Sequence, residues 1–215
     1  MNIGILGTGV VGKTIGTRLV ELGHNVRMGS RTADNLNAQA WVRSVGESAS
    51  HGTYSEAARY SNILFNCTAG RGTLSALELI KAADLNNKIL IDVANPLDYS
   101  RGMPPTMSVC NTDSLGEQIQ REHKLLRVVK AVNCMGVEVM VNPKLVPAPR
   151  DALICGNDLD AKNNVTAILI EWFGWDSVID LGDISNARGM EMALPLWLSL
   201  RQKFGTNNFH LHVAH

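Results

Sequence analysis

Neither sign of charge dominates this sequence of 215 residues, because 20 lysines and arginines balance 20 aspartates and glutamates. A neutral chain gives no electrostatic reason to expect nucleic acid or an anionic membrane as a partner. The chain also lacks an apolar run of the roughly 20 residues that span a bilayer. Its first residues read as a structural strand and not as a signal peptide. We therefore expect a cytoplasmic protein.

Cysteine is scarce and scattered. Three of the four cysteines lie in or beside apolar runs, and no pair shows C-x-x-C spacing: Cys67, Cys110, Cys134 and Cys155. This distribution predicts free thiols in a reducing compartment, and it argues against a disulfide framework or a zinc site. Three histidines stand near the C-terminus without a carboxylate or cysteine close by, so we expect no metal site there: His210, His212 and His215.

The usual catalytic signatures are missing as well. The sequence contains no G-x-S-x-G, no H-E-x-x-H and no recognisable nucleophile–base spacing, so we assign no catalytic residue. Lys130 could act as an acid or base, but a structural lysine whose ammonium reaches solvent is the favoured interpretation. Hydride transfer between a nicotinamide and a flavin-like ring mainly needs two stacked rings at the right distance. The missing acid–base pair therefore favours a redox cofactor as the second substrate.

A glycine-rich turn near the N-terminus is the strongest motif present. Asn2–Leu6 reads as an apolar strand, a helical pattern follows, and G-x-G-x-x-G stands between them. Gly7 permits the tight turn, Gly9 lets the backbone approach a pyrophosphate, and Gly12 lets the helix pack on the sheet. The free N–H groups of the helix N-terminus then face the phosphates. The expected dinucleotide-binding residues are Gly7, Thr8, Gly9, Val10, Val11 and Gly12.

Residues 25–28 read as the second strand, and the residues that follow its end indicate which dinucleotide binds. A fold that binds NAD normally carries Asp or Glu about 20 residues after the glycines, where it accepts hydrogen bonds from the ribose. This chain has Ser30, Arg31 and Thr32 instead. Their hydroxyls and guanidinium suit a 2′-phosphate, although the same residues could form a solvated polar turn. We favour NADP over NAD.

Apolar runs alternate with helical patterns along the rest of the chain, which predicts an α/β fold with a doubly wound parallel sheet of the Rossmann type. Near-continuous apolar runs are typical of parallel strands buried on both faces. Strands are expected at residues 49–53, 63–67, 88–93, 126–132, 152–155 and 177–180. Helices are expected at residues 33–42, from 55 on, and at 73–82, 114–122 and 161–173.

Small or polar residues follow two of the buried strands. Thr68 and Ala69 come after one, and Ala94, Asn95 and Pro96 come after the next. Ligands of open α/β sheets bind beyond the carboxyl ends of the strands, so these loops should pass beside the cofactor. Asn95 could bond a carboxamide or serve only as a turn residue before proline. A long loop without periodicity follows around residues 101–105, and we expect it to be functional.

The prolines at 143, 147 and 149 mark a boundary between two parts of the chain. We expect a cofactor domain at residues 1–147 and a small C-terminal α/β domain at residues 148–215. A final helix should run from Ser185 or Asn186 to Lys203 and break near residues 193–194, because Pro195 interrupts it. This helix is more apolar than one core face requires, so it should line a substrate pocket, meet a partner subunit or be buried within the chain.

Six segments spread over nearly the whole chain carry a further set of motifs: residues 7–12, 29–32, 92–96, 128–133, 155–158 and 180–182. These motifs resemble those of the coenzyme F-420-dependent NADP reductase family. They are similar also to the oxidoreductase domains of the STEAP metalloreductases, which pass electrons from NADPH to a flavin. The resemblance implies a Rossmann domain and a small C-terminal domain, an acceptor ring in the cleft between them, and a homodimer.

The same resemblance assigns roles by position. Thr8, Ser30 and Arg31 would hold the 2′-phosphate end of NADP, and Ala94, Asn95 and Pro96 would lie by the nicotinamide. The residues near the acceptor ring would be Asn133, Cys134 and Met135. The archaeal enzymes carry a further basic residue a few positions after the arginine, where this chain has Asp34, Asn35 and Leu36. Discrimination for the phosphate should therefore be weaker here.

Together these observations predict an NADPH-dependent oxidoreductase that transfers hydride to a deazaflavin or flavin: coenzyme F-420, FMN or FAD. One alternative is an NADPH reductase of a small carbonyl compound that uses Lys130 or an unrecognised residue. Another is an NADP-binding sensor without turnover. An enzyme should have a cleft beside the nicotinamide that admits a planar ring. A sensor should lack such a pocket and present its apolar final helix to a protein partner.

Overall fold

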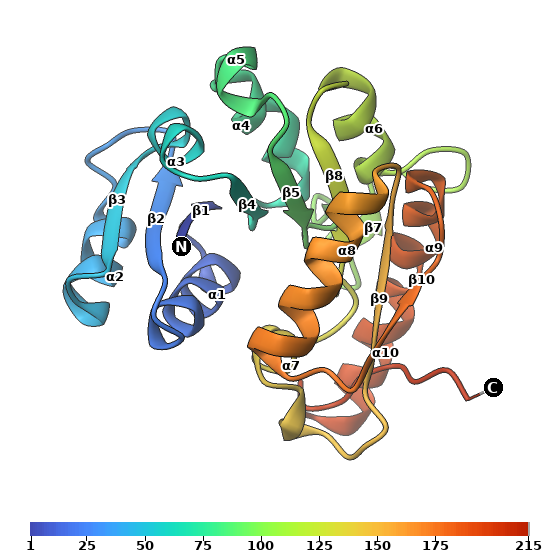
Figure 1. Cartoon of the computed structure of the whole chain (residues 1–215). Helices are drawn as coiled ribbons and strands as arrows, with labels where there is room; N and C mark the ends of the chain where they lie inside the picture. Colours follow the sequence, from blue (N-terminus) through green and yellow to red (C-terminus); the bar gives the residue numbers. More distant parts are fainter. Residues whose placement is uncertain (215) are drawn as a thin grey trace.

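The computed structural model, shown in Figure 1, describes residues 1–214, so His215 lies outside the described residues. Within that range the strands are β1 (Asn2–Leu6), β2 (Asn25–Ser30), β3 (Ala49–Thr53), β4 (Ile63–Asn66), β5 (Ile89–Asp92), β6 (Leu97–Asp98), β7 (Thr106–Met107), β8 (Arg127–Ala131), β9 (Asp151–Gly156) and β10 (Ser177–Asp180).

Helices connect most of these strands. The α-helices are α1 (Val10–Glu21), α2 (Leu36–Val45), α3 (Tyr54–Tyr60), α4 (Thr73–Glu78), α5 (Ala82–Leu85), α6 (Leu115–Glu122), α7 (Val137–Val141), α8 (Leu159–Ala167), α9 (Ala187–Met192) and α10 (Leu194–Phe204). A π-helical segment, η3 (Ile168–Phe173), continues α8, and single 3-10 turns are η1 (Gly70–Gly72), η2 (Pro143–Leu145) and η4 (Ile184–Asn186).

The large sheet has the strand order β10-β9-β8-β5-β4-β1-β2-β3. Six neighbouring strands of this sheet run parallel: β8, β5, β4, β1, β2 and β3. At the other end, β9 pairs antiparallel with β8 and parallel with β10. The order reverses between β1 and β4, which is the switch point where ligands bind in open α/β sheets. This topology confirms the predicted Rossmann-type α/β fold. The sheet continues past residue 147 through β9 and β10, and the division into domains at residues 147 and 148 stays a proposal.

Helices cover both faces of the sheet, and each face has its own apolar core (Figure 1). Ile5 and Phe65 pack with α1, α2, α7 and α8 on one face. Leu64 and Leu90 pack with α3, α4, α6 and α9 on the other. Because neighbouring residues of a strand point to opposite faces, a strand covered on both sides is apolar throughout. This arrangement explains the continuous apolar runs in the sequence.

Most predicted elements are confirmed, and two need correction. The helix expected from residue 33 starts at Leu36, because the Asn35 side chain accepts from the Ala38 N–H and caps it, so Asp34 precedes the first turn. The helix expected at 73–82 is split into α4 and α5 by the extended backbone of Lys81. The long loop near residues 101–105 is bounded by the antiparallel pair β6–β7.

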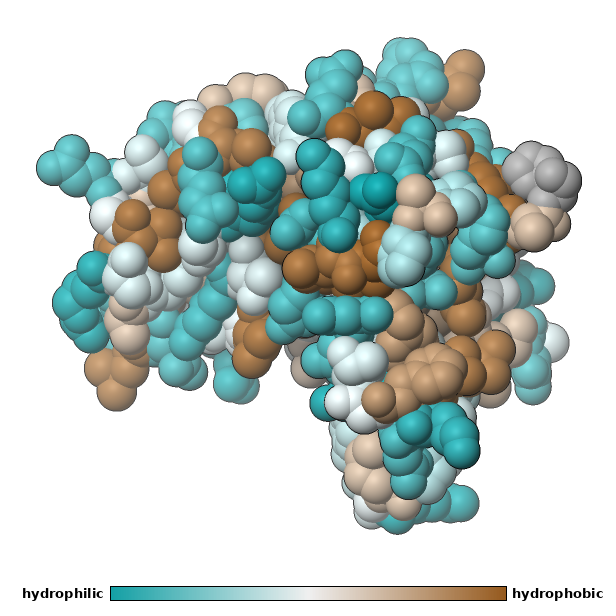
Figure 2. All heavy atoms as spheres, turned by 90° about the horizontal axis from the view of Figure 1, so that it is seen from below, coloured by the Kyte–Doolittle hydropathy of each residue, from teal (hydrophilic) through white to brown (hydrophobic). Residues whose placement is uncertain are grey.

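The final helix breaks at Ala193 as predicted, because Pro195 stands in the first turn of α10. Its apolar side chains divide between three environments. Leu194 and Trp197 are buried, Met190 is buried beside a cavity described below, and Leu196 and Phe204 are more than half exposed. Figure 2 shows the molecule from below, and on this face apolar residues form several patches among polar ones.

Among residues 1–214, none of the helices is long and apolar enough to cross a membrane. The same residues contain no group of three or more His, Cys, Asp or Glu side chains that could hold a metal ion.

Candidate functional site

The glycine turn between β1 and α1 has the geometry of a phosphate cradle. Gly7 has a φ of +119°, and a Cβ on Gly12 would lie 2.3 Å from the Gly7 carbonyl oxygen. Around Gly9, by contrast, no atom of the described chain apart from Gly9 and its immediate neighbours lies within 4 Å of an added Cβ. Within the described chain, α1 has neither a side-chain cap nor an acidic residue in its first turn. Its first N–H groups are therefore available to an anion at the place where Gly9 leaves room.

The residues expected at the 2′-phosphate lie at the end of β2, but they are not equivalent. Ser30 is buried, and its hydroxyl donates to the Thr32 carbonyl. Thr32 is exposed, and its hydroxyl bond to the Asp34 carboxylate lowers the pKa of Asp34. Arg31 is exposed. The guanidinium of Arg31 is thus the group of the three that is most open to a ligand.

A cavity of about 350 Å³ lies at the carboxyl ends of β1, β4 and β5. It brings together Val11 of the glycine turn, Thr68 and Ala69 after β4, and Ala94 and Asn95 after β5. These predicted cofactor residues come from three segments of the chain, and they meet at the switch point of the sheet. Pro96 is buried next to Asn95.

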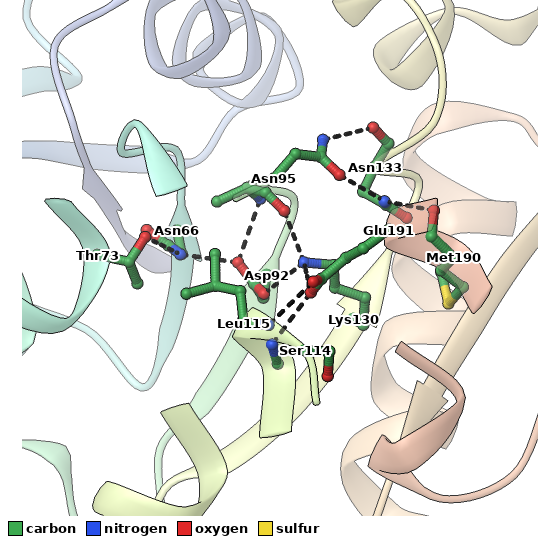
Figure 3. A network of polar contacts seen from close by, with 12 residues as sticks. Asn66, Thr73, Asp92, Asn95, Ser114, Leu115, Lys130, Asn133, Met190 and Glu191 are labelled. Carbon is green, nitrogen blue, oxygen red and sulfur yellow. Dashed lines mark hydrogen bonds and ion pairs between the residues drawn. The ribbon is translucent and has the colours of Figure 1, made fainter. Parts of the chain in front are cut away.

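Directly beneath this cavity, a row of polar side chains crosses three neighbouring strands. Asn66 pairs with Asp92 between β4 and β5, and Asp92 pairs with Lys130 between β5 and β8. Paired residues of neighbouring strands point to the same face of a sheet. The Asn66 amide donates to Asp92 Oδ1 at 2.7 Å, and the Lys130 ammonium donates to Asp92 Oδ2 at 2.9 Å (Figure 3).

Lys130 is fully buried, so the expectation that its ammonium reaches solvent is wrong. Its Nζ donates to Asp92 at 2.9 Å, to the Ala94 carbonyl at 2.6 Å and to Glu191 at 2.7 Å. Burial opposes the charge, but the two carboxylates outweigh burial and raise the pKa of Lys130. All three ammonium protons are engaged, which makes Lys130 a structural cation and not a proton donor to a substrate.

Glu191 brings α9 into this cluster from the far end of the chain. Its carboxylate accepts from the backbone N–H groups of Leu115 at 2.9 Å and Gly116 at 3.1 Å, the first residues of α6. These N–H groups belong to the positive end of the helix dipole and compensate part of the carboxylate charge. Burial nevertheless raises the pKa of Glu191, and the Lys130 ammonium limits the rise.

On the β4 side, the polar row continues into the wall of the cavity. The Thr68 hydroxyl donates to Asn66 Oδ1 at 2.7 Å and lies 2.7 Å from the Thr73 hydroxyl. Asn66 Nδ2 lies 3.3 Å from the same Thr73 hydroxyl. The loop after β4 is therefore fixed by the same network that holds Asp92.

A reciprocal pair of asparagines closes the site on the β8 side. Asn95 Nδ2 donates to the Asn133 carbonyl at 2.8 Å, and Asn133 Nδ2 donates to Asn95 Oδ1 at 2.7 Å and to the Met190 carbonyl at 2.9 Å. Between strand β8 and Asn133, Val132 has a φ of +43°, an unusual conformation for a β-branched residue. Backbone strain of this kind is concentrated at functional sites.

A second cavity, of about 190 Å³, lies on the other side of this pair. It is lined by the three residues expected at the acceptor ring, Asn133, Cys134 and Met135. Met190 of α9, Leu211 and Asp151 also line it. Burial raises the pKa of Cys134 to about 12, so its thiol stays protonated. Bonds from the Ser177 hydroxyl and from His212 lower the pKa of Asp151, which keeps its carboxyl ionised.

The network beneath the cavities was not anticipated from the sequence. A polar residue inside each of three apolar strands was a usable signal, because a buried polar group needs a partner. Asn66, Asp92 and Lys130 are those residues. Glu191 gave no such signal, since 61 positions separate it from Lys130 and only the packing of α9 joins them.

Comparisons with known proteins agree with this geometry. The family model described as NADP oxidoreductase, coenzyme F-420-dependent, matches residues 2–96. A crystal structure of a protein from Arthrobacter sp. FB24, assigned as an F-420-dependent NADP reductase, is 40% identical and has a TM-score of 0.93, and each chain covers 99% of the other.

Two further relatives are more distant. The F-420-dependent NADP reductase of Methanothermobacter marburgensis is 27% identical over 100% of this chain and 98% of its own length. The rat metalloreductase STEAP3 is 31% identical over 91% of this chain. The chain spans only 36% of the length of STEAP3.

Proposed function

The chain belongs to the coenzyme F-420-dependent NADP reductase family of oxidoreductases, and on this premise we propose that it transfers hydride between NADP(H) and a deazaflavin or flavin-type acceptor. One observation carries the proposal. The two cavities share a wall, because Asn95 lines the first, Asn133 lines the second, and their amides are bonded to each other. Hydride transfer needs two reacting rings held close together, and adjoining cavities provide that arrangement.

The residues present suit the proposed cofactor. The uncapped α1 N-terminus and the open space at Gly9 would receive the pyrophosphate, and Arg31 would contact the 2′-phosphate. The cavity with Thr68, Ala69, Ala94 and Asn95 would hold the nicotinamide. The nicotinamide ring supplies the hydride when it is bound, and the chain contributes position and exclusion of water.

The titratable groups argue for a ring acceptor over a carbonyl compound. Carbonyl reduction calls for a proton donor, and Asp151 is the one carboxyl group among the described residues that line the acceptor cavity. Asp151 is a poor donor because its pKa is lowered, and Lys130 is engaged by Asp92, Ala94 and Glu191 beneath the site. The small volume of the acceptor cavity, about 190 Å³, is the observation that favours a small carbonyl substrate.

The first test follows NADPH oxidation by its absorbance, with coenzyme F-420, FMN, FAD, ferric chelates and small aldehydes offered separately. NADH serves as the control cofactor. We expect rapid turnover with F-420 or a flavin, and faster reaction with NADPH than with NADH. Turnover with the aldehydes alone would replace the ring acceptor by a carbonyl compound. Tight NADPH binding without turnover on any acceptor would favour the NADP-binding sensor.

We also propose that the protein is a cytoplasmic homodimer. Leu196 and Phe204 of α10 are 55% and 58% exposed, and a second copy of the chain would cover such apolar side chains. Sedimentation of the wild type and of the variant with both residues changed to serine tests the dimer. We expect a dimer for the first and a monomer for the second. A monomeric wild type would reject the proposal.

A further inference from the structure

Two short segments on opposite sides of the site are joined twice. The first segment is Ala94–Asn95, which lines the cofactor cavity, and the second is Met190–Glu191 of α9, at the acceptor cavity. Lys130 donates to the Ala94 carbonyl and to Glu191, and Asn133 donates to Asn95 and to the Met190 carbonyl. Figure 3 shows Lys130 and Asn133 between the two segments.

Each connection uses directional bonds from a side chain that has little freedom to move. Lys130 is fully buried, and its three donors are all engaged. Asn133 is 2% exposed, and both protons of its amide are used by the chain. A displacement of the Ala94–Asn95 segment must therefore be transmitted to Met190–Glu191 or break bonds between buried groups, which is costly.

Stability alone does not explain buried ions at this place. Desolvation offsets most of the attraction in a buried ion pair, and apolar side chains of similar volume stabilise a core as well or better. The apolar core on this face of the sheet includes Leu90, Val128 and Met190, so such packing surrounds the ions. What the ionic groups add is a fixed geometry between elements that are distant in the sequence.

We propose that Lys130 and Asn133 are positioning residues that couple the two cavities, so that NADP(H) bound on one side fixes the acceptor side for hydride transfer. The inference rests on the proposed function. Met190 provides the structural link, because its carbonyl accepts from Asn133 and the residue also lines the acceptor cavity. The cofactor thereby prepares the acceptor cavity, and by reciprocity a bound acceptor strengthens cofactor binding.

The test compares amide hydrogen exchange with and without NADP⁺ in the wild type, Asn133→Ala and Lys130→Met. In the wild type, NADP⁺ should slow exchange in residues 94–97 and also in α9. In both variants the protection of residues 94–97 should remain and that of α9 should be reduced, because each substitution removes one of the two connections. Asn133→Ala removes no charge, so it decides the question if Lys130→Met does not fold. Equal protection of α9 in wild type and Asn133→Ala would overturn the proposal, as would an unprotected α9 in the wild type.

Lys162→Met is the matched control. Lys162 is also a buried lysine paired with a carboxylate, Asp180, but it lies on α8 and contacts neither segment. It should retain the wild-type exchange pattern. With the best acceptor, Asn133→Ala should lower kcat about 10- to 100-fold and change the NADPH Kd less than about 3-fold, as expected for misplaced reactants. The exchange experiment needs no acceptor, so it tests the coupling independently of activity. A wild type that is inactive with every acceptor would reject the proposed function, and the exchange data would still decide whether the two segments are coupled.

Discussion

The two ends of the proposed cofactor site are built in different ways. The phosphate end consists of Gly7–Gly12 and Ser30–Thr32, and it offers backbone N–H groups and one guanidinium. Its exposed residues are Gly9, Val10, Arg31 and Thr32. The nicotinamide end is held by buried side chains, and the bond between Leu115 and Glu191 joins residues 76 positions apart. The first is a local and open cradle. The second is a rigid network of distant residues.

The chemistry of each end explains the difference. A phosphate needs charge and donors, and small displacements alter its binding only moderately. Hydride transfer depends steeply on the distance between reacting atoms, so the nicotinamide end benefits from a fixed wall. The network of Asn66, Asp92, Lys130 and Glu191 supplies such a wall beneath Ala94 and Asn95.

The largest effect on folding is expected at Lys130. Lys130→Met leaves Asp92 and Glu191 buried without their cation, and breaking a buried ion pair in this way costs about 3–5 kcal/mol. Urea unfolding measures the loss. Lys124→Met, at an exposed lysine close by in the sequence, should change the free energy of unfolding by less than about 0.5 kcal/mol. Equal losses in the two variants would contradict the buried network.

At the phosphate end, substitutions of two glycines should affect different properties, one the stability of the fold and the other NADPH binding. Gly12→Ala places a Cβ 2.3 Å from the Gly7 carbonyl oxygen and should destabilise the fold by about 1–3 kcal/mol. Gly9→Ala adds a methyl group that meets nothing within 4 Å in the described chain beyond its immediate neighbours, and it should leave the melting temperature unchanged. It should weaken NADPH binding about tenfold, roughly 1.4 kcal/mol, because the methyl group takes the space proposed for the pyrophosphate. Unchanged NADPH affinity in Gly9→Ala would place the phosphates elsewhere.

At Arg31 the expected effect is confined to one cofactor. Arg31→Ala should weaken NADPH binding by about 1–3 kcal/mol and leave NADH binding unchanged, because only NADPH loses a charge-assisted bond. Titration calorimetry with both cofactors measures the difference. Arg43→Ala, at an exposed arginine of α2, is the control and should affect neither. Equal losses for NADPH and NADH would reject the 2′-phosphate role.

These two ends also mark what the sequence could predict. The glycine turn, the order of strands and helices and the break before Pro195 follow from neighbouring residues, and each was predictable. The start of α2 was misplaced by a few residues because Asn35, and not an earlier residue, provides the cap. Local signals therefore predict the fold and the glycine turn between β1 and α1.

The network could not be derived in the same way. An isolated lysine in an apolar strand is compatible with an ammonium that reaches solvent, and that was the expectation for Lys130. The decisive fact is the alignment of Asn66, Asp92 and Lys130 across three strands, which depends on register. Glu191 completes the cluster only when α9 packs on α6. Such placements are properties of the folded chain and not of any segment.

The smallest effect is expected at an ion pair on the rim of the buried network. Glu117 of α6 accepts from Arg188 of α9 at 2.8 Å, and their side chains are 12% and 38% exposed. The Arg188 bond, and then the Ser114 bond, lower the pKa of Glu117 against the effect of burial. Because the folded pKa is depressed, the stabilisation is present above the ordinary glutamate value of about 4.3 and is lost as the pH falls through the folded value.

Glu117→Gln tests this dependence. At neutral pH the variant should be less stable than the wild type by about 0.2–1 kcal/mol in urea unfolding, the usual range for a partly exposed pair. The difference should disappear well below pH of about 4. Glu122→Gln, on the exposed part of α6, is the control and should be as stable as the wild type at neutral pH. A Glu117→Gln difference that persists at low pH would mean that packing, and not charge, joins the rims of α6 and α9. Of the charged contacts between these helices, those of the buried Glu191 with the Leu115 and Gly116 N–H groups would then be the ones that matter.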